Sequence, residues 1–321
     1  MRGNYETFRY TYNFIIKNMW EELLQKLQQG DVKALSRSIS IIENEQEGYS
    51  SMLQALPPNS NTKIIGITGP PGAGKSTLAD LLIGEFVKKG KKLAMLCVDP
   101  SSPFNMGAVL GDRIRMSNWF IHPDVFIRSL ATRGSLGGLH PKIIEITDLL
   151  KAFHFDYIII ETVGIGQSEV EIAGLADVTA VILVPEAGDE VQTMKAGLME
   201  IADIFVVNKS DRPGADTFVK NLQQMLAPAF RSHYNEVPVL KTIASQQEGI
   251  RELADTILHQ LQKKNISDKK YWLLAEKACY LIQKQRMAGI DKQILKKEIE
   301  QLSLSGKFNL YKYCKNFSVN Q

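Results

Sequence analysis

The sequence predicts an α/β fold in which a mainly parallel sheet is flanked by helices, with helical extensions at both ends of the chain. Two observations lead to this fold class. Short apolar runs typical of strands recur along the chain, and patterns typical of helices separate them. A helix between successive strands returns the chain so that the strands run parallel. The 321 residues suffice for one such domain with a buried core, plus appended segments.

The expected strands and segments follow from these patterns and from the breakers between them. The predicted strands are Lys63–Thr68, Lys92–Val98, Asp124–Arg128, Tyr157–Glu161, Val178–Val184, Ile204–Asn208 and Val237–Ile243. Two or three helices are expected after residue 247. The predicted divisions are an extension over 1–18, an N-terminal helical segment over 19–60, a nucleotide-binding domain over 61–262 and a C-terminal helical segment over 263–321.

The N-terminal region is expected to be helical from residue 19. Leu23, Leu24 and Leu27 share one helical face, and Asp31 can cap a second helix that carries apolar residues at Leu35, Ile39 and Ile42. Residues 1–18 lack the long apolar core and cleavage site of a secretory signal. A frayed extension or a start assigned too far upstream accounts for them best, and an organelle-targeting segment is the alternative.

The glycine-rich stretch 69–77 fits the phosphate-binding pattern G-x-x-x-x-G-K-[ST] and lies between a predicted strand and a predicted helix. In such a P-loop, glycines let backbone N–H groups converge on phosphate oxygens at a helix N-terminus. Lys75 is expected to reach the β- and γ-phosphates, and the Ser76 hydroxyl to bind Mg²⁺. The expected phosphate-binding residues are Gly69, Pro70, Pro71, Gly72, Ala73, Gly74, Lys75, Ser76 and Thr77.

A second signature, Asn208-Lys209-Ser210-Asp211, ends a later strand and fits the N-K-x-D pattern that reads guanine. The Asp211 carboxylate can accept hydrogen bonds from two donors of guanine, which adenine does not offer together. Asn208 is expected to hold the loop and contact the base edge, while the Lys209 stem packs on the ring. Ala244 and Ser245 follow the last strand and are candidates for a backbone contact with the guanine oxygen.

Three carboxylates are candidates for the metal and for catalysis. Glu161 ends a strand before Thr162-Val163-Gly164, in the place of a D-x-x-G element, so that Glu161 is expected at Mg²⁺ and the Gly164 N–H at the γ-phosphate. Asp99 and Asp112 can serve the outer shell of Mg²⁺ or orient the attacking water, with helix or turn capping as the alternative. Ile165 stands where Ras-like GTPases have a water-orienting Gln, which predicts slow hydrolysis without a partner.

Composition narrows the classes of partner. A net charge of +3 is too small to imply a nucleic-acid partner, and no apolar run is long enough to predict a membrane span. Three scattered cysteines suggest neither a disulfide framework nor a zinc site and fit a reducing cytoplasm. From residue 262 onward, thirteen Lys/Arg stand against five Asp/Glu. A solvated face explains that excess best, and an acidic partner or membrane surface is the alternative.

These motifs together resemble the methylmalonyl-CoA mutase-associated GTPase family (MeaB/ArgK-like), in the SIMIBI class of P-loop proteins. The stretches that carry the resemblance are 30–44, 66–77, 98–103, 111–116, 132–139, 161–177 and 185–211. The resemblance covers about residues 20–260. It implies a homodimeric cytosolic GTPase that binds an adenosylcobalamin-dependent acyl-CoA mutase, gates the loading of intact cofactor and protects the enzyme.

The resemblance also implies roles for particular residues. Positions matching the phosphate, Mg²⁺ and catalytic residues of the family are Lys75, Ser76, Asp99, Asp112 and Glu161, and positions matching its base-reading pair are Asn208 and Asp211. Residues 185–196 match a mobile loop that signals the nucleotide state, with Gln192 and Lys195 in the contacting positions. From residue spacing alone, this loop would be interpreted as the solvent-exposed start of a helix.

One departure and three alternatives accompany the resemblance. The final stretch, 306–314, does not fit the usual alanine-rich ending of the family, which affects the expected dimer geometry. A kinase would share the P-loop but has no need for Asp211. A nickel-type metallochaperone GTPase would need His/Cys metal sites, and the five histidines are scattered. A scaffold that does not hydrolyse nucleotide is the third alternative.

Overall fold

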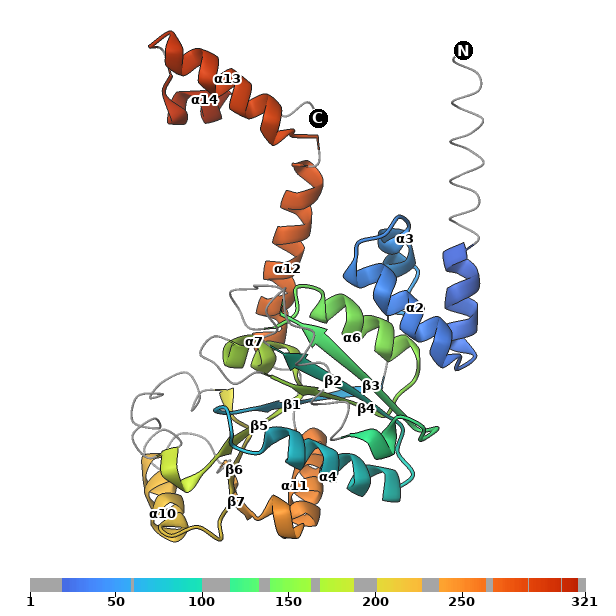
Figure 1. Cartoon of the computed structure of the whole chain (residues 1–321), viewed down its shortest axis with the longest axis vertical. Helices are drawn as coiled ribbons and strands as arrows, with labels where there is room; N and C mark the ends of the chain where they lie inside the picture. Colours follow the sequence, from blue (N-terminus) through green and yellow to red (C-terminus); the bar gives the residue numbers. More distant parts are fainter. Residues whose placement is uncertain are drawn as a thin grey trace. The chain divides into compact units, whose positions relative to one another are not determined.

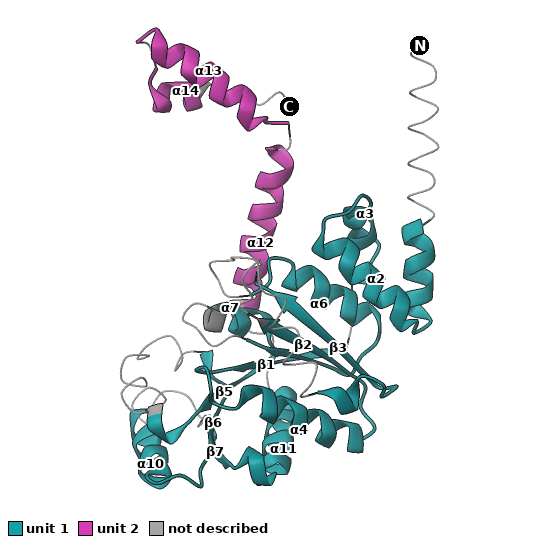
Figure 2. Ribbon diagram, in the orientation of Figure 1, with its two compact units in different colours: residues 1–267 teal, residues 268–321 magenta. Residues whose placement is uncertain are grey.

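The computed structural model describes the residues 19–58, 61–99, 116–132, 139–162, 168–187, 201–226, 237–263, 268–287, 289–306 and 308–316. The chain divides into two compact units, Met1–Ser267 and Asp268–Gln321, which Figure 2 distinguishes by colour. Within the described residues, no helix is long and apolar enough to cross a membrane.

A seven-stranded parallel sheet forms the centre of the first unit, which confirms the predicted fold class (Figure 1). The strand order is β3-β2-β4-β1-β5-β6-β7, and the pairing between each two neighbours is parallel. The strands are β1 (Lys63–Thr68), β2 (Leu93–Asp99), β3 (Val125–Ala131), β4 (Tyr157–Glu161), β5 (Val178–Leu183), β6 (Ile204–Asn208) and β7 (Val239–Thr242). Since every strand runs in the same direction, all the carboxyl ends meet at one edge of the sheet.

Helices cover both faces of this sheet. Figure 1 shows α4 (Lys75–Lys88) and α11 (Ile250–Lys263) on one face and α6 (Ile143–Ala152) and α7 (Ser168–Leu175) on the other. Side chains alternate along β1 accordingly. Ile65 and Ile67 belong to the core cluster that contains α4 and α11. Gly66 faces α7 so closely that an added Cβ would lie 2.7 Å from Ile172 Cγ1.

One aromatic side chain fastens a short 3₁₀ turn, η1 (Ser117–Trp119), to helix α4. The indole Nε1 of Trp119 donates a 2.7 Å hydrogen bond to Asp80 Oδ1. The ring lies over Gly84, where an added Cβ would come within 3.4 Å of it. Burial raises the pKa of the Asp80 carboxyl, and the hydrogen bond from Trp119 opposes that rise.

The N-terminal segment forms a helix over 19–28, followed by α2 (Val32–Glu43) and α3 (Tyr49–Gln54). Asp31 caps α2 as expected, because its Oδ1 accepts hydrogen bonds from the backbone N–H of Lys33 at 2.7 Å and of Ala34 at 3.1 Å. The predicted apolar face is also confirmed. Its buried side chains are Leu23, Leu24, Leu27, Leu35, Ile39 and Ile42.

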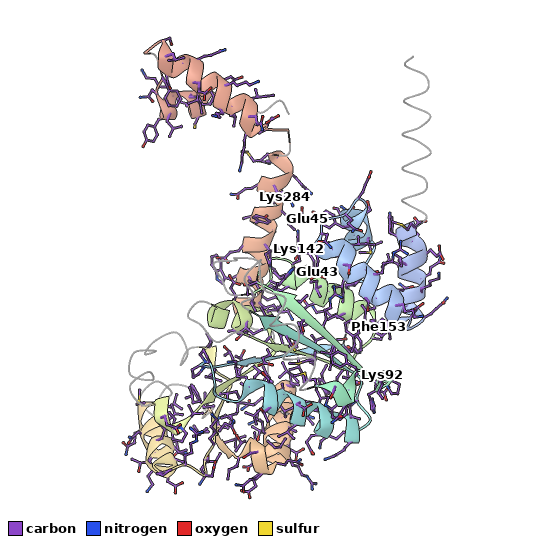
Figure 3. All side chains as sticks on the ribbon, viewed as in Figure 1. Glu43, Glu45, Lys92, Lys142, Phe153 and Lys284 are labelled. Atoms are coloured by element: carbon purple, nitrogen blue, oxygen red, sulfur yellow. The ribbon has the colours of Figure 1, made fainter. Side chains whose placement is uncertain are left out.

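Charged side chains join this segment to the sheet and to α6. Glu43 pairs with Arg128 of β3, and Lys142 Nζ lies 2.6 Å from Glu45 and 3.5 Å from Glu145. Figure 3 labels Glu43, Glu45 and Lys142 at this junction. Burial lowers the pKa of Lys142, but its two carboxylate partners outweigh that effect and hold the pKa above its ordinary value.

The second unit consists of α12 (Asp268–Arg286), α13 (Lys292–Leu304) and α14 (Leu310–Asn316). Together with α11, four helices follow residue 247 in the described residues, whereas the sequence predicted two or three. The additional helix has a local cause, since Asn309 Oδ1 accepts a 3.0 Å hydrogen bond from the Lys312 N–H. None of the described side chains in this unit is buried, and Trp272 is 68% exposed.

Candidate functional site

The candidate site lies at the carboxyl edge of the sheet, where the loops after four strands meet. The glycine-rich loop follows β1, Glu161 ends β4 and Asn208 ends β6. The turn η3 (Ala244–Gln246) follows β7. This edge is where ligands bind in open parallel sheets with helices on both faces.

Three glycines of the loop after β1 have a backbone conformation that other residues rarely adopt. Gly69, Gly72 and Gly74 have φ angles of 138°, 76° and 91°. An added Cβ would lie 2.0 Å from Ile182 O at Gly69 and 2.3 Å from Asn208 Nδ2 at Gly74. At Gly72 it would meet nothing within 4 Å. The loop is therefore pressed against β5 and β6 on one side and open on the other.

Helix α4 begins directly after this loop, and its first residue places a cation inside the loop. The buried Lys75 Nζ donates hydrogen bonds to Gly69 O at 2.9 Å and to Pro70 O at 3.1 Å. Gly74 precedes the helix and offers no side-chain cap to its first N–H groups. An ammonium group and the N-terminal end of a helix both favour an anion at this point.

Two oxygen-bearing side chains meet at the start of α4, one from the first turn of that helix and one from the end of β4. Ser76 Oγ donates a 2.6 Å hydrogen bond to Glu161 Oε1. A hydroxyl and a carboxylate are the ligands that Mg²⁺ prefers, so this pair fits the metal that the motifs imply. Among the described residues, no group of three or more His, Cys, Asp or Glu side chains could hold a metal by itself.

The end of β4 is fixed against β1 next to this pair. Thr162 Oγ1 donates a 2.8 Å hydrogen bond to Thr68 Oγ1, and the Thr162 N–H donates to Ile67 O at 3.0 Å. These bonds fix the backbone just after Glu161 to the end of β1, just before the glycine-rich loop. The Glu161 carboxylate therefore keeps a set position relative to Ser76.

Asn208 connects the loops after β1, β6 and β7. Its buried Nδ2 donates to Ala73 O at 2.8 Å, and its Oδ1 accepts from the Ala244 N–H at 3.2 Å and from Thr242 Oγ1 at 3.1 Å. Lys209 Nζ adds a 2.8 Å hydrogen bond to Gly72 O. From its place at the end of β6, Asn208 thus contacts the loop after β1 and the end of β7 with the turn that follows it.

A pocket of about 260 Å³ lies beside these contacts. Its lining residues are Gly74, Thr77, Asn208, Lys209, Asp211, Arg212, Ala244 and Ser245. Sequence reasoning had singled out each of these residues except Arg212. The sequence offers one indication that Arg212 lines this pocket, since Arg212 follows Asp211 directly. The motif pattern ends at the aspartate, so nothing in the pattern extends to the next residue.

Several predicted site residues lie outside the described residues. They are Asp112, Gly164, Gln192 and Lys195, together with most of the segment 185–196. Asp99 is described in its backbone only, at the end of β2. Their predicted roles remain predictions.

A larger hollow of about 680 Å³ runs along α11, away from the motif residues. It is lined by Gln247, Gly249, Arg251, Glu252, Asp255, Thr256 and His259. Two of its carboxylate contacts are ion pairs, from Asp255 to Lys89 at 2.8 Å and to Arg251 at 4.0 Å. Its size alone does not make it the functional site, because the residues suited to phosphate and base lie in the smaller pocket.

Comparisons with known proteins show which proteins this chain is similar to. The family model described as "Methylmalonyl Co-A mutase-associated GTPase MeaB" matches residues 35–296. A Pyrococcus abyssi protein whose name describes a GTPase is 48% identical over 243 residues, which are 74% of this chain and 75% of that protein. A fused isobutyryl-CoA mutase of Geobacillus kaustophilus is 36% identical over 257 residues, which are 75% of this chain but 24% of that protein.

Among solved structures, the crystal structure of an LAO/AO transport system kinase superposes with a TM-score of 0.64 at 25% identity. The superposition covers 93% of this chain and 96% of that one. The fold of the sheet and of the helices that flank it is therefore shared with this solved structure.

Proposed function

Because the chain belongs to the family of methylmalonyl Co-A mutase-associated GTPases described as MeaB, we propose that it is a nucleotide-dependent chaperone of an acyl-CoA mutase. In this proposal the protein binds GTP, hydrolyses it to GDP and phosphate, and changes its contacts with an adenosylcobalamin-dependent mutase accordingly. The observation that carries the proposal is the buried Asn208 side chain. It links the phosphate-binding loop to the pocket that Asp211 lines.

Guanine is the base that the pocket suits. The exposed Asp211 carboxylate can accept from the ring N–H and the exocyclic amine of guanine, and hydrogen bonds to a charged group are about twice as strong as neutral ones. Ala244 lies on the same pocket, and its N–H already meets Asn208 Oδ1 at 3.2 Å. An adenine base would leave the Asp211 carboxylate without its donor pair, so we infer a preference for GTP over ATP.

Lys75, Ser76 and Glu161 are assigned to the phosphates and to Mg²⁺. Lys75 Nζ bonds to two carbonyls of the loop, and in this proposal it exchanges these bonds for bonds to phosphate oxygens when nucleotide binds. Ser76 and Glu161 would hold Mg²⁺, which would offset the negative charge on the phosphate oxygens. Asp99, Asp112 and Gly164 complete the proposed set. Ile165 follows Gly164, so intrinsic hydrolysis is expected to be slow until a partner supplies or positions a further group.

The mutase partner is supported by one relative in particular. The Geobacillus kaustophilus protein carries a region similar to this chain within a fused isobutyryl-CoA mutase. We infer that a region that is fused to a mutase in one protein acts as a separate partner of a mutase in another. We assign the contact to the segment 185–196, with Gln192 and Lys195 as the contacting side chains, and we expect a cytoplasmic homodimer.

The test combines binding and turnover. Isothermal titration calorimetry with GTP, GDP and ATP measures the base preference, and phosphate release measures turnover with and without a purified acyl-CoA mutase. We expect guanine nucleotides to bind with Mg²⁺ and the mutase to accelerate release severalfold. Equal affinity for ATP and GTP would contradict the base assignment, and fast release by the isolated protein would contradict the dependence on a partner.

A kinase is the second candidate, and the solved structure titled as an LAO/AO transport system kinase is the observation that favours it. A kinase would transfer the γ-phosphate to another molecule, whereas a GTPase releases it to water. Mass balance between phosphate released and nucleotide consumed separates the two. A shortfall of free phosphate that appears on a second molecule would favour the kinase.

A further inference from the structure

Arg212 is the member of the 260 Å³ pocket to which no motif assigns a role. It follows Asp211 directly and lies just before α10 (Ala215–Leu226). Its Nη1 pairs with Glu186 Oε1, which belongs to the short turn η2 (Pro185–Ala187) after β5. The Asp211 carboxylate and the Arg212 guanidinium therefore line the pocket at adjacent positions in the sequence. Glu186, in the turn after the neighbouring strand β5, pairs with that guanidinium.

The chemistry of arginine suits the part of a purine that Asp211 does not reach. A guanidinium is planar, always charged and carries five N–H donors, so one pair with a carboxylate leaves a flat cationic surface available. Such a surface stacks well on an aromatic ring. Asp211 can satisfy the edge of guanine by hydrogen bonding, but a ring also needs a partner over its face.

The geometry of the sheet explains why the partner of Arg212 is Glu186. Strands β5 and β6 are neighbours, with Leu183 opposite Val207. The turn after β5 and the loop after β6 therefore start side by side at the carboxyl edge. The side chains of Arg212 and Glu186 are 44% and 52% exposed, so the pair lies at the rim, where an incoming ring can reach the guanidinium.

We propose that Arg212 is a further binding residue that covers one face of the guanine base, and that Glu186 is the positioning residue that holds its guanidinium over the pocket. This inference rests on the proposed function, since it takes the pocket to be the guanine site. It also links the base to the turn after β5. Because coupling between two sites is reciprocal, a base that favours one arrangement of Arg212 also favours the matching arrangement of Glu186.

The experiment is a double-mutant cycle read out by calorimetric dissociation constants for GDP and GTP. Arg212→Ala is expected to weaken both nucleotides by roughly three- to tenfold, as for loss of a cation over a ring at a half-exposed site. Glu186→Ala is expected to weaken both by about two- to threefold, because exposed ion pairs contribute little. The double variant should bind no worse than Arg212→Ala alone, since Glu186 acts through Arg212.

Conservative variants separate positioning from a merely structural role. Glu186→Asp keeps the carboxylate and is expected to retain binding, whereas Glu186→Gln is expected to behave like Glu186→Ala. The matched control is Asp216→Ala. This variant removes an exposed ion pair in which Lys241 Nζ lies 3.0 Å from Asp216 Oδ1. Neither residue lines the pocket, so both dissociation constants should stay unchanged.

Three results would count against the inference. If Arg212→Ala binds GDP and GTP like the wild-type chain, Arg212 does not contact the base. If the two single losses simply add in the double variant, Glu186 does not act by positioning Arg212. If the wild-type chain binds no guanine nucleotide, the proposed function itself fails and the assignment of Arg212 fails with it, so the two failures are distinguishable.

Discussion

Asn208 shows how one buried amide can organise a site built from several loops. Both ends of its side chain are used, with Ala73 O on the donor end and Ala244 N–H and Thr242 Oγ1 on the acceptor end. The motif predicted that Asn208 would hold the loop. It did not predict the particular carbonyl of the phosphate loop, because that contact depends on how three strand ends meet in space.

Asn208→Ala is therefore expected to lower the free energy of unfolding by about 2–4 kcal/mol, since buried hydrogen-bonding groups lose their partner. It should also weaken GDP binding, because the phosphate loop and the base pocket lose their connection. Urea denaturation measures the first effect and calorimetry the second. An unchanged GDP affinity in a destabilised variant would show that the connection supports only the fold.

Asp211 governs base choice in the proposed function, so Asp211→Asn should change which nucleotide binds best. An amide presents a donor toward the position of the guanine amine, where xanthine carries an oxygen. We expect GTP binding to weaken by about tenfold or more and xanthosine triphosphate to become the preferred ligand. Calorimetry with both nucleotides measures this, and Asp216→Asn, an exposed carboxylate outside the pocket, is the control.

The Asp80 carboxyl predicts how the stability of the fold depends on pH. Burial raises its pKa in the folded state, so the folded chain holds this proton more tightly than the unfolded chain does. Stability is therefore lost as the pH rises from the ordinary value of 3.8 through the raised folded pKa. Asp80→Asn keeps an oxygen for Trp119 and removes the charge. Above this window the variant should be more stable than the wild-type chain, and the difference should shrink as the pH falls below 3.8.

Urea denaturation of the wild-type chain and of Asp80→Asn between pH 3 and pH 8 measures how this difference in the free energy of unfolding changes with pH. A difference that does not change with pH would assign the effect of Asp80→Asn to packing against Trp119 rather than to the charge.

At the scale of elements, the N-terminal helices are joined to α6 through Lys142. Its ammonium is buried between Glu45 and Glu145 and lies 5.2 Å from the centre of the Tyr49 ring. Removing one member of a buried ion pair costs more than removing an exposed one, because the remaining charges lose their compensation. Substitution of the buried Lys142 is therefore expected to cost more than substitution of an exposed ion-pair member nearby.

Lys142→Ala is expected to lower the free energy of unfolding by about 2–4 kcal/mol. Lys151→Ala, on the helix α6 that Lys142 precedes, is the control. It removes a more exposed pair with Asp148 and should cost about 0.5 kcal/mol or less. Thermal or urea unfolding of both variants checks the comparison, and equal losses would contradict a buried role for Lys142.

The elements themselves were largely predictable from the sequence. Strands β1, β4 and β6 have the predicted bounds, because continuous apolar runs bounded by turn residues are typical of buried parallel strands. The cap of α2 by Asp31 was predictable for a similar local reason. The sequence predicted two or three helices after residue 247, and the short α14 with its Asn309 cap has no periodic apolar pattern that would raise this number to four.

The residues of the candidate site were predictable from the sequence mainly where they belong to a motif. Seven of the eight residues that line the 260 Å³ pocket belong to the two motifs or to the pair Ala244-Ser245. Arg212 was missed because its place in the pocket depends on an ion pair with Glu186, which is distant in the sequence. Long-range pairs of this kind leave no local pattern.

At the scale of the whole molecule, the two units differ in how they are held together. The first unit has a large buried core on both sides of the sheet, whereas the described part of the second unit has none. A helical unit of this size without a core gains little from burial and is stable only when something covers it. We expect a second copy of the chain to do so, as the proposed homodimer requires.

Removal of residues 268–321 should therefore abolish self-association and leave GDP binding unchanged, since every lining residue of the pocket belongs to the first unit. Sedimentation velocity of the full-length and shortened chains measures the first effect and calorimetry the second. A dimer that survives the truncation would place the interface in the first unit.

The packing of Trp119 on α4 has an optical consequence. The chain has three tryptophans, and they report on three different regions: Trp20 on the N-terminal helix, Trp119 on the phosphate-binding helix and Trp272 on α12. Trp119 is bonded to a carboxylate and packed on a helix, whereas Trp272 is largely exposed to solvent. Their emission should differ in wavelength and in access to quenchers. Variants that keep a single tryptophan would allow the fluorescence of each region to be measured separately, without an added label.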